Sequence, residues 1–115
     1  MKLNVYDRIR GILRSYNNRY GEISYKEAKV ILKNDKNSTL IDVRSPQEYK
    51  EGHLEDSINL PLYDLEERFK KDLNDREKAI IIYCQTGNRS KKAIEILEKQ
   101  GYINLYDIEG GLDNI

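Results

Sequence analysis

The residues best suited to do chemistry lie in one short segment, which contains the only cysteine of the chain. Cys84 is followed by Gln85, Thr86, Gly87, Asn88, Arg89 and Ser90. A thiolate is a strong nucleophile, a glycine permits a tight backbone curl, and an arginine offers a fixed positive fork to an anionic substrate. The segment therefore predicts a reactive thiol beside an anion-binding loop.

The elements expected around this segment favour the thiolate form of Cys84. Residues 79–83 are the most apolar run of the chain, and an apolar run without alternation is typical of a strand in the centre of a parallel sheet. Residues 90–100 have helical periodicity. The loop N–H groups and the positive end of this helix would stabilise a sulfur anion. A lone cysteine is otherwise most often a small buried hydrophobic residue.

The rest of the chain alternates predicted helices and strands. Capping boxes at Ser24–Glu27 and Ser45–Glu48 predict two helix starts, the second with Pro46 at its first position. Apolar runs and periodicity predict strands in residues 39–43, 57–60 and 104–108 and a helix from about residue 62. This alternation predicts an α/β domain with a mostly parallel sheet.

Composition excludes several classes of protein. The 115 residues are enough for one domain, and 20 basic residues balance 20 acidic ones, which argues against a nucleic-acid-binding protein. No apolar stretch is long enough to span a membrane, and the first ten residues have no secretory pattern. A single cysteine allows no internal disulfide, so a cytoplasmic location is expected.

The first twenty residues differ from the rest of the chain. They contain five basic residues and one acidic residue, and large side chains recur at helical spacing at Tyr6, Ile9, Leu13, Tyr16 and Tyr20. Residues 1–20 are therefore expected to form a basic amphipathic helical extension, with residues 21–115 as the domain. Such a helix packs on its own domain or docks on an acidic partner or anionic surface.

Three stretches together resemble the single-domain rhodaneses, a family of sulfurtransferases. Residues 84–90 are similar to the active-site loop of that family. Residues 40–49 (LIDVRSPQEY) and 52–61 (GHLEDSINLP) are similar to its first signature, and residues 101–111 (GYINLYDIEGG) to its C-terminal signature. The resemblance covers residues 21–115. It implies an α/β, rhodanese-like fold, with a five-stranded, mostly parallel sheet and helices on both faces.

The resemblance also implies a reaction. Cys84 would take the outer sulfur of a donor such as thiosulfate, keep it as a persulfide, and pass it to cyanide or a thiol. The loop N–H groups would hold the persulfide, and Arg89 would orient the anionic donor. The alternative for Arg89 is an ion pair with an acidic neighbour. No cofactor is expected, and one cysteine with one histidine does not make a metal site.

Four residues outside the loop are expected to brace the pocket. By the resemblance, Asp42, Arg44 and Glu48 match residues that do so through hydrogen bonds. His53 is the only histidine. It is interpreted as a loop-bracing residue rather than a general base, because a thiolate that has already formed needs no base.

Other functions remain open on the same scaffold. A phosphatase or arsenate reductase of this fold would need a longer loop than the four residues between Cys84 and Arg89. A protein-dependent sulfur relay or carrier with little thiosulfate turnover is a closer alternative, because Arg89 is the only basic side chain of the loop. A redox-sensing thiol would usually have a second cysteine beside it.

The expected partners are a small anionic sulfur donor and a thiol or cyanide acceptor, or a protein donor or acceptor in the case of a relay.

The chain lacks the tryptophan that commonly follows Gly110 and Gly111 in the family. A frayed C-terminus that leaves the loop unaffected is therefore expected.

Overall fold

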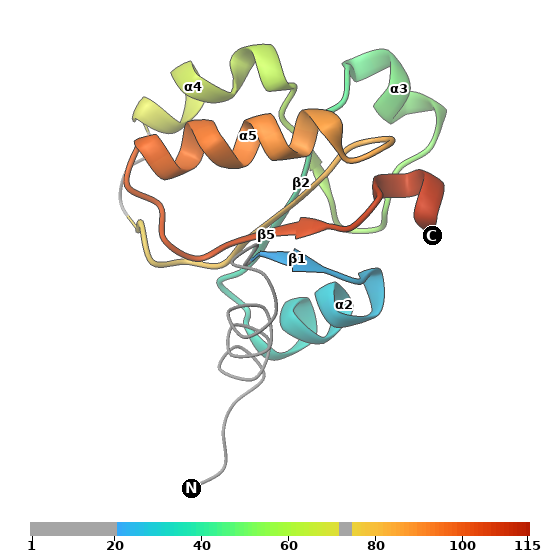
Figure 1. Cartoon of the computed structure of the whole chain (residues 1–115), viewed down its shortest axis with the longest axis horizontal. Helices are drawn as coiled ribbons and strands as arrows, with labels where there is room; N and C mark the ends of the chain where they lie inside the picture. The colour runs from blue at the N-terminus through green and yellow to red at the C-terminus, as the bar shows by residue number, and fades with distance from the viewer. Residues whose placement is uncertain (1–20, 72–74) are drawn as a thin grey trace, which may run out of the picture.

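A five-stranded sheet forms the centre of the structure, a computed structural model that describes residues 21–71 and 75–115 (Figure 1). The strands lie in the order β1-β5-β4-β2-β3, and each pair of neighbours among them is parallel. They are β1 (Glu22–Ile23), β2 (Thr39–Asp42), β3 (Ile58–Asn59), β4 (Ile80–Tyr83) and β5 (Leu105–Ile108). The five-stranded sheet is confirmed, and it is parallel throughout the described residues.

Helices cover both faces of this sheet, as expected for the α/β class. Figure 1 shows α4 and α5 over one face and α2 over the other. The helices are α2 (Tyr25–Asn34), α3 (Pro46–Glu51), α4 (Leu62–Lys71), α5 (Asn88–Lys99) and the short 3-10 helix η1 (Gly111–Asn114). The capping boxes at Ser24 and Ser45 are both formed, so α2 and α3 begin where the sequence predicts.

The central strand β4 explains why its sequence is apolar without alternation. All four of its residues are 0% exposed. Ile80 and Ile82 belong to the core cluster on the α4/α5 face, whereas Ile81 and Tyr83 belong to the cluster on the α2 face. Burying each such aliphatic side chain contributes about 1.5–3 kcal/mol. The strand therefore provides a rigid base directly before Cys84.

Helix α5 begins at Asn88, two residues before the predicted start. Gly87 is its N-cap, with a left-handed φ of 102° that glycine adopts without strain. The sequence pattern missed this start because Asn88 and Arg89 add nothing to the apolar stripe of the helix. As a result, the first-turn N–H groups of α5 belong to the loop itself.

Strand β1 was not predicted from the residue pattern, although the resemblance implied a fifth strand. It has two residues, which pair with Asp107 and Ile108 of β5. A segment this short shows no periodicity, so only its pairing defines it. The helical extension expected in residues 1–20 lies outside the described residues. In the described part, no helix is both long and apolar enough to cross a membrane.

The C-terminus is where the sequence-based expectation is wrong. Residues 111–114 form η1, and its backbone binds the loop. The N–H of Leu112 donates to the carbonyl of Cys84, and that of Asp113 to the carbonyl of Gln85, both at 3.0 Å. The final residues therefore support the loop instead of fraying, because their N–H groups have partners there.

The contact between η1 and the loop predicts that Gly111→Ala is strongly destabilising. Gly111 has a φ of 65°, and an added Cβ would lie 2.7 Å from the Gln85 carbonyl oxygen and also against that of Cys84. Backbone strain and this clash should together lower the free energy of unfolding by at least about 2 kcal/mol. Urea denaturation followed by circular dichroism measures the change.

Gly52→Ala is the matched control for Gly111→Ala. Gly52 also has a positive φ, 149°, but an added Cβ there would meet nothing within 4 Å. Gly52→Ala should therefore cost less than Gly111→Ala. Equal costs in the two variants would show that the contact of η1 with the loop is unimportant.

Candidate active site

The loop that follows β4 curls around the sulfur of Cys84. The backbone N–H of Gly87 donates to Cys84 Sγ at 3.0 Å, and the N–H of Ser90 does so at 3.4 Å. The Ser90 hydroxyl oxygen lies 3.6 Å from the same sulfur. Cys84 itself is 0% exposed. These donors, at the positive end of α5, are placed to stabilise negative charge on sulfur.

Three carbonyl groups of the loop accept hydrogen bonds from its surroundings. Those of Cys84 and Gln85 accept the two bonds from η1 described above. The carbonyl of Gly87 accepts from the Ser90 hydroxyl at 3.1 Å and from Lys91 Nζ at 3.4 Å. In a planar trans peptide the N–H points opposite to the C=O, so the two carbonyls bound by η1 turn the following N–H groups, those of Gln85 and Thr86, away from η1. These are different groups from the Gly87 and Ser90 N–H groups that donate to Cys84 Sγ.

Asp42 and Arg44, at the end of β2, form a buried ion pair beside the loop. Arg44 Nη2 lies 2.7 Å from Asp42 Oδ2, and Arg44 Nε donates to both carboxylate oxygens at 3.1 Å. Burial alone would lower the pKa of Arg44, but the hydrogen bonds and charge of Asp42 outweigh it and raise the pKa. The rest of the guanidinium donates to Gln85 Oε1 at 3.2 Å and to the Gly52 carbonyl at 2.6 Å. Arg44 therefore links three segments around the loop.

Arg89 forms an ion pair with Glu48 through two parallel hydrogen bonds. Nη1 donates to Oε1 at 2.6 Å and Nη2 to Oε2 at 2.9 Å. The bonds from Arg89 hold the pKa of Glu48 at about 2, below its usual 4.5, and the capping bonds from Ser45 add to this effect. The acidic neighbour considered from the sequence is thus present. Glu48 in turn raises the pKa of Arg89, with smaller contributions from the charges of Cys84 and Asp42.

The remaining predicted residues lie at the surface. Thr86 and Asn88 are exposed on the loop. His53 is also exposed, its ring stacks on Tyr49 with centroids 3.7 Å apart, and its Nδ1 lies 2.8 Å from the Tyr49 carbonyl. In the described residues, His53 makes no hydrogen bond to Cys84. The imidazole therefore contacts the end of α3 rather than the thiol.

Sequence reasoning missed two residues near the loop, Asp107 and Lys91. Asp107 is 1% exposed on β5, and its Oδ2 lies 3.3 Å from Nζ of Lys91. Burial raises the pKa of Asp107, although the Ser90 hydroxyl and the Lys91 charge oppose the shift. A carboxylate inside a short apolar strand is unusual, and this pattern could have singled out Asp107 from the sequence.

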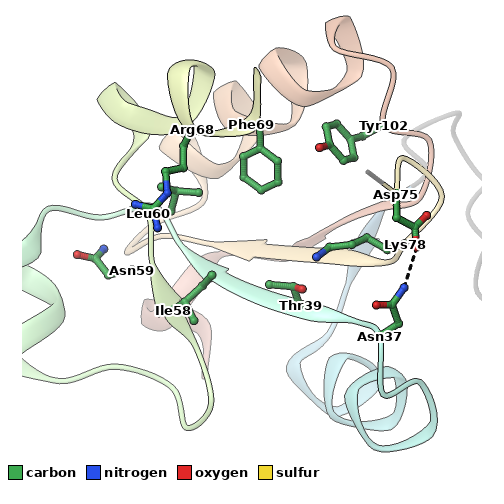
Figure 2. Close-up of a pocket in the computed structure, with 10 residues that line it drawn as sticks. All are labelled: Asn37, Thr39, Ile58, Asn59, Leu60, Arg68, Phe69, Asp75, Lys78 and Tyr102. Atoms are coloured by element: carbon green, nitrogen blue, oxygen red, sulfur yellow. Dashed lines mark hydrogen bonds between the residues drawn. The ribbon is translucent and has the colours of Figure 1, made fainter. Parts of the chain in front are cut away.

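Two of the cavities among the described residues lie at different places in the fold. One of about 420 Å³ is at the amino ends of β2 and β4, beneath α4 (Figure 2), so it is remote from Cys84, which follows the carboxyl end of β4. The other, of about 430 Å³, lies beside the loop and is bordered by Arg44, Glu48 and Gln85. Among the described residues, no group of three or more His, Cys, Asp and Glu side chains could hold a metal ion.

Comparison with known proteins identifies the family. The sequence model of the rhodanese-like domain matches residues 24–115. The chain belongs to this family. Its match begins at the first capping box and includes the loop, the strand ends and η1, so the resemblance of the three motifs and the expected rhodanese-like fold are both confirmed.

Individual relatives of this rhodanese-like domain differ in length and in name. Thiosulfate sulfurtransferase PspE of Escherichia coli (strain K12) is 37% identical over 75 residues, which are 65% of this chain and 71% of that protein. A probable molybdopterin-synthase adenylyltransferase of Porphyra purpurea is 40% identical over 75 residues, 65% of this chain but only 19% of that protein. A solved rhodanese with anions from E. coli has a TM-score of 0.59 and 36% identity, covering 68% of this chain and 91% of that one.

The pair Glu48–Arg89 predicts a specific loss of stability in acid. The folded-state pKa of Glu48 is about 2, against a usual 4.5, so its pairing stabilises the fold above pH 4.5 and is lost as the pH falls toward 2. The difference in melting temperature between wild type and Arg89→Met should therefore shrink over this range. Thermal unfolding followed by circular dichroism measures it, and a constant difference would contradict the prediction.

Proposed function

We propose that the chain is a sulfurtransferase that carries a sulfane sulfur as a persulfide on Cys84. The observation that carries the proposal is the loop geometry, with the N–H groups of Gly87 and Ser90 3.0 Å and 3.4 Å from Cys84 Sγ. The same donors can hold the outer sulfur of a persulfide anion. Membership of the rhodanese-like family, with relatives named thiosulfate sulfurtransferases, supports the same chemistry.

The reaction has two half-steps. The Cys84 thiolate attacks the outer sulfur of the donor, a new S–S bond forms, and the bond inside the donor breaks, with its electron pair leaving on sulfite when the donor is thiosulfate. An acceptor such as cyanide or a thiolate then attacks the outer sulfur of the persulfide. The Cys84 thiolate returns, and thiocyanate or a new persulfide leaves. Attack by the thiolate form of Cys84 requires no separate base.

In this proposal the other loop residues bind rather than react. Arg89 lies at the start of α5, where an anionic donor that binds its guanidinium would lie next to the carboxylate of Glu48. Arg44 and Asp42 keep Gln85 in place, and the exposed Thr86 and Asn88 form the outer rim of the loop. His53 braces the end of α3.

A first experiment tests the persulfide directly. Intact-protein mass spectrometry after incubation with thiosulfate should show a gain of one sulfur atom that cyanide removes. Cys84→Ser should show no gain, because a serine hydroxyl is not ionised at neutral pH and forms no S–S bond. Cys84 is the only cysteine, so the site of the gain is unambiguous. Retention of the gain in a folded Cys84→Ser would contradict the proposal.

A sulfur relay is the second candidate, and one observation favours it. Arg89, the cation of the loop, is already bound by Glu48, which leaves less positive charge for a small anionic donor. A relative from Porphyra purpurea is named an adenylyltransferase, and this chain matches 19% of its length. Loading of Cys84 by a cysteine desulfurase carrying a persulfide, at a rate well above that with thiosulfate, would identify the relay. The reverse order of rates would exclude it.

A further inference from the structure

Positive charge next to the loop is balanced by carboxylates. Among residues 21–71 and 75–115, three cationic side chains contact the loop or belong to it, and each has a carboxylate partner: Arg44 with Asp42 at 2.7 Å, Arg89 with Glu48 at 2.6 Å, and Lys91 with Asp107 at 3.3 Å. In two of these pairs the cation is poorly placed to bind an anionic donor. The side chain of Arg44 is 4% exposed, and Lys91 binds the Gly87 carbonyl.

Arg89 is therefore the cation that we assign to the donor: its side chain is 39% exposed and belongs to the loop, whereas Lys91, although 47% exposed, binds the Gly87 carbonyl and Asp107. Several hydrogen bonds hold Glu48, the carboxylate partner of Arg89, in position. Both carboxylate oxygens of Glu48 accept from the guanidinium, and Oε1 also accepts from the backbone N–H and the hydroxyl of Ser45, each at 3.1 Å. A donor that binds Arg89 must approach this carboxylate, and the repulsion grows with the negative charge of the donor.

We propose that Glu48 is a specificity-determining residue that makes the site prefer sulfur donors with one negative charge or less over dianions such as thiosulfate. The inference rests on the proposed sulfurtransferase function and adds to it the class of donor. Thiosulfonate monoanions and thiol persulfides belong to the favoured class. Thiosulfate, with two negative charges, belongs to the disfavoured one.

Methanethiosulfonate and thiosulfate form a suitable pair of probes. In both, the Cys84 thiolate attacks the terminal sulfur and the bond from that sulfur to the oxidised sulfur breaks. The electron pair leaves on methanesulfinate in one case and on sulfite in the other. The same Cys84 persulfide results, with no oxidant or reductant. The probes differ mainly in carrying one negative charge or two.

Glu48→Gln removes the charge and preserves the local structure. Glutamine is also found at this position of a capping box, so its side chain can still accept from Ser45. Glu98→Gln is the control. Glu98 is exposed and lies near the C-terminal end of α5, whereas the loop lies at the start of that helix.

The experiment measures second-order rate constants for loading of Cys84 by each probe, using intact-protein mass spectrometry. Glu48→Gln should raise the ratio of the thiosulfate rate to the methanethiosulfonate rate by about tenfold, the effect of about 1.4 kcal/mol. Glu98→Gln should change this ratio by less than about twofold, because an exposed charge at the far end of α5 is screened from the loop. Adding Arg89→Met to Glu48→Gln should abolish the gain.

The outcomes separate the two proposals. If Cys84 is loaded but the ratio in Glu48→Gln equals that in wild type, the inference about Glu48 is overturned and the sulfurtransferase stands. Equal changes with both probes would give Glu48 a purely structural role and would also overturn the inference. If Cys84 is loaded in no variant, either by the two probes or by a desulfurase that carries a persulfide, the proposed function itself fails.

Discussion

The candidate site depends on the direction in which a few peptide groups of the loop face. The N–H groups of Gly87 and Ser90 face the sulfur, and the loop keeps this conformation because carbonyls that turn away from it have partners. The 3-10 helix η1 binds the carbonyls of Cys84 and Gln85, and the Ser90 hydroxyl and Lys91 bind that of Gly87. The last residues of the chain and the start of α5 together therefore determine the polarity of the space around the sulfur.

The parallel sheet brings the other parts of the site together. In the register of β2 with β4, Asp42 lies opposite Tyr83, so the segments after both residues leave the sheet at the same edge. Arg44 and the loop are consequently neighbours although they are far apart in sequence. This placement agrees with the rule that ligands bind at the carboxyl ends of strands in open α/β sheets. The burial of β4 on both faces gives this edge a stable position.

Charge around the site is organised in pairs rather than as a positive field. The buried pair Asp42–Arg44 costs desolvation, which its hydrogen bonds offset, and it serves to connect segments more than to attract a ligand. The more exposed pair Glu48–Arg89 is different, because solvent and an anionic donor can both reach it. In a site built this way, binding of an anion is a competition with a carboxylate. The charge of the donor then becomes a basis for selection.

The sequence by itself determined the class of fold, the order of most elements and the position of the nucleophile. These follow from local signals: the unbroken apolar run of β4, the two capping boxes, and a cysteine followed by a glycine and an arginine. The tertiary structure decided the partners. Pairing of Arg89 with Glu48, burial of Asp107, strand β1 and the contact of η1 with the loop all join segments distant in the chain. These contacts arise because the parallel sheet packs distant segments side by side, and the local periodicity of the sequence does not reveal which segments will meet.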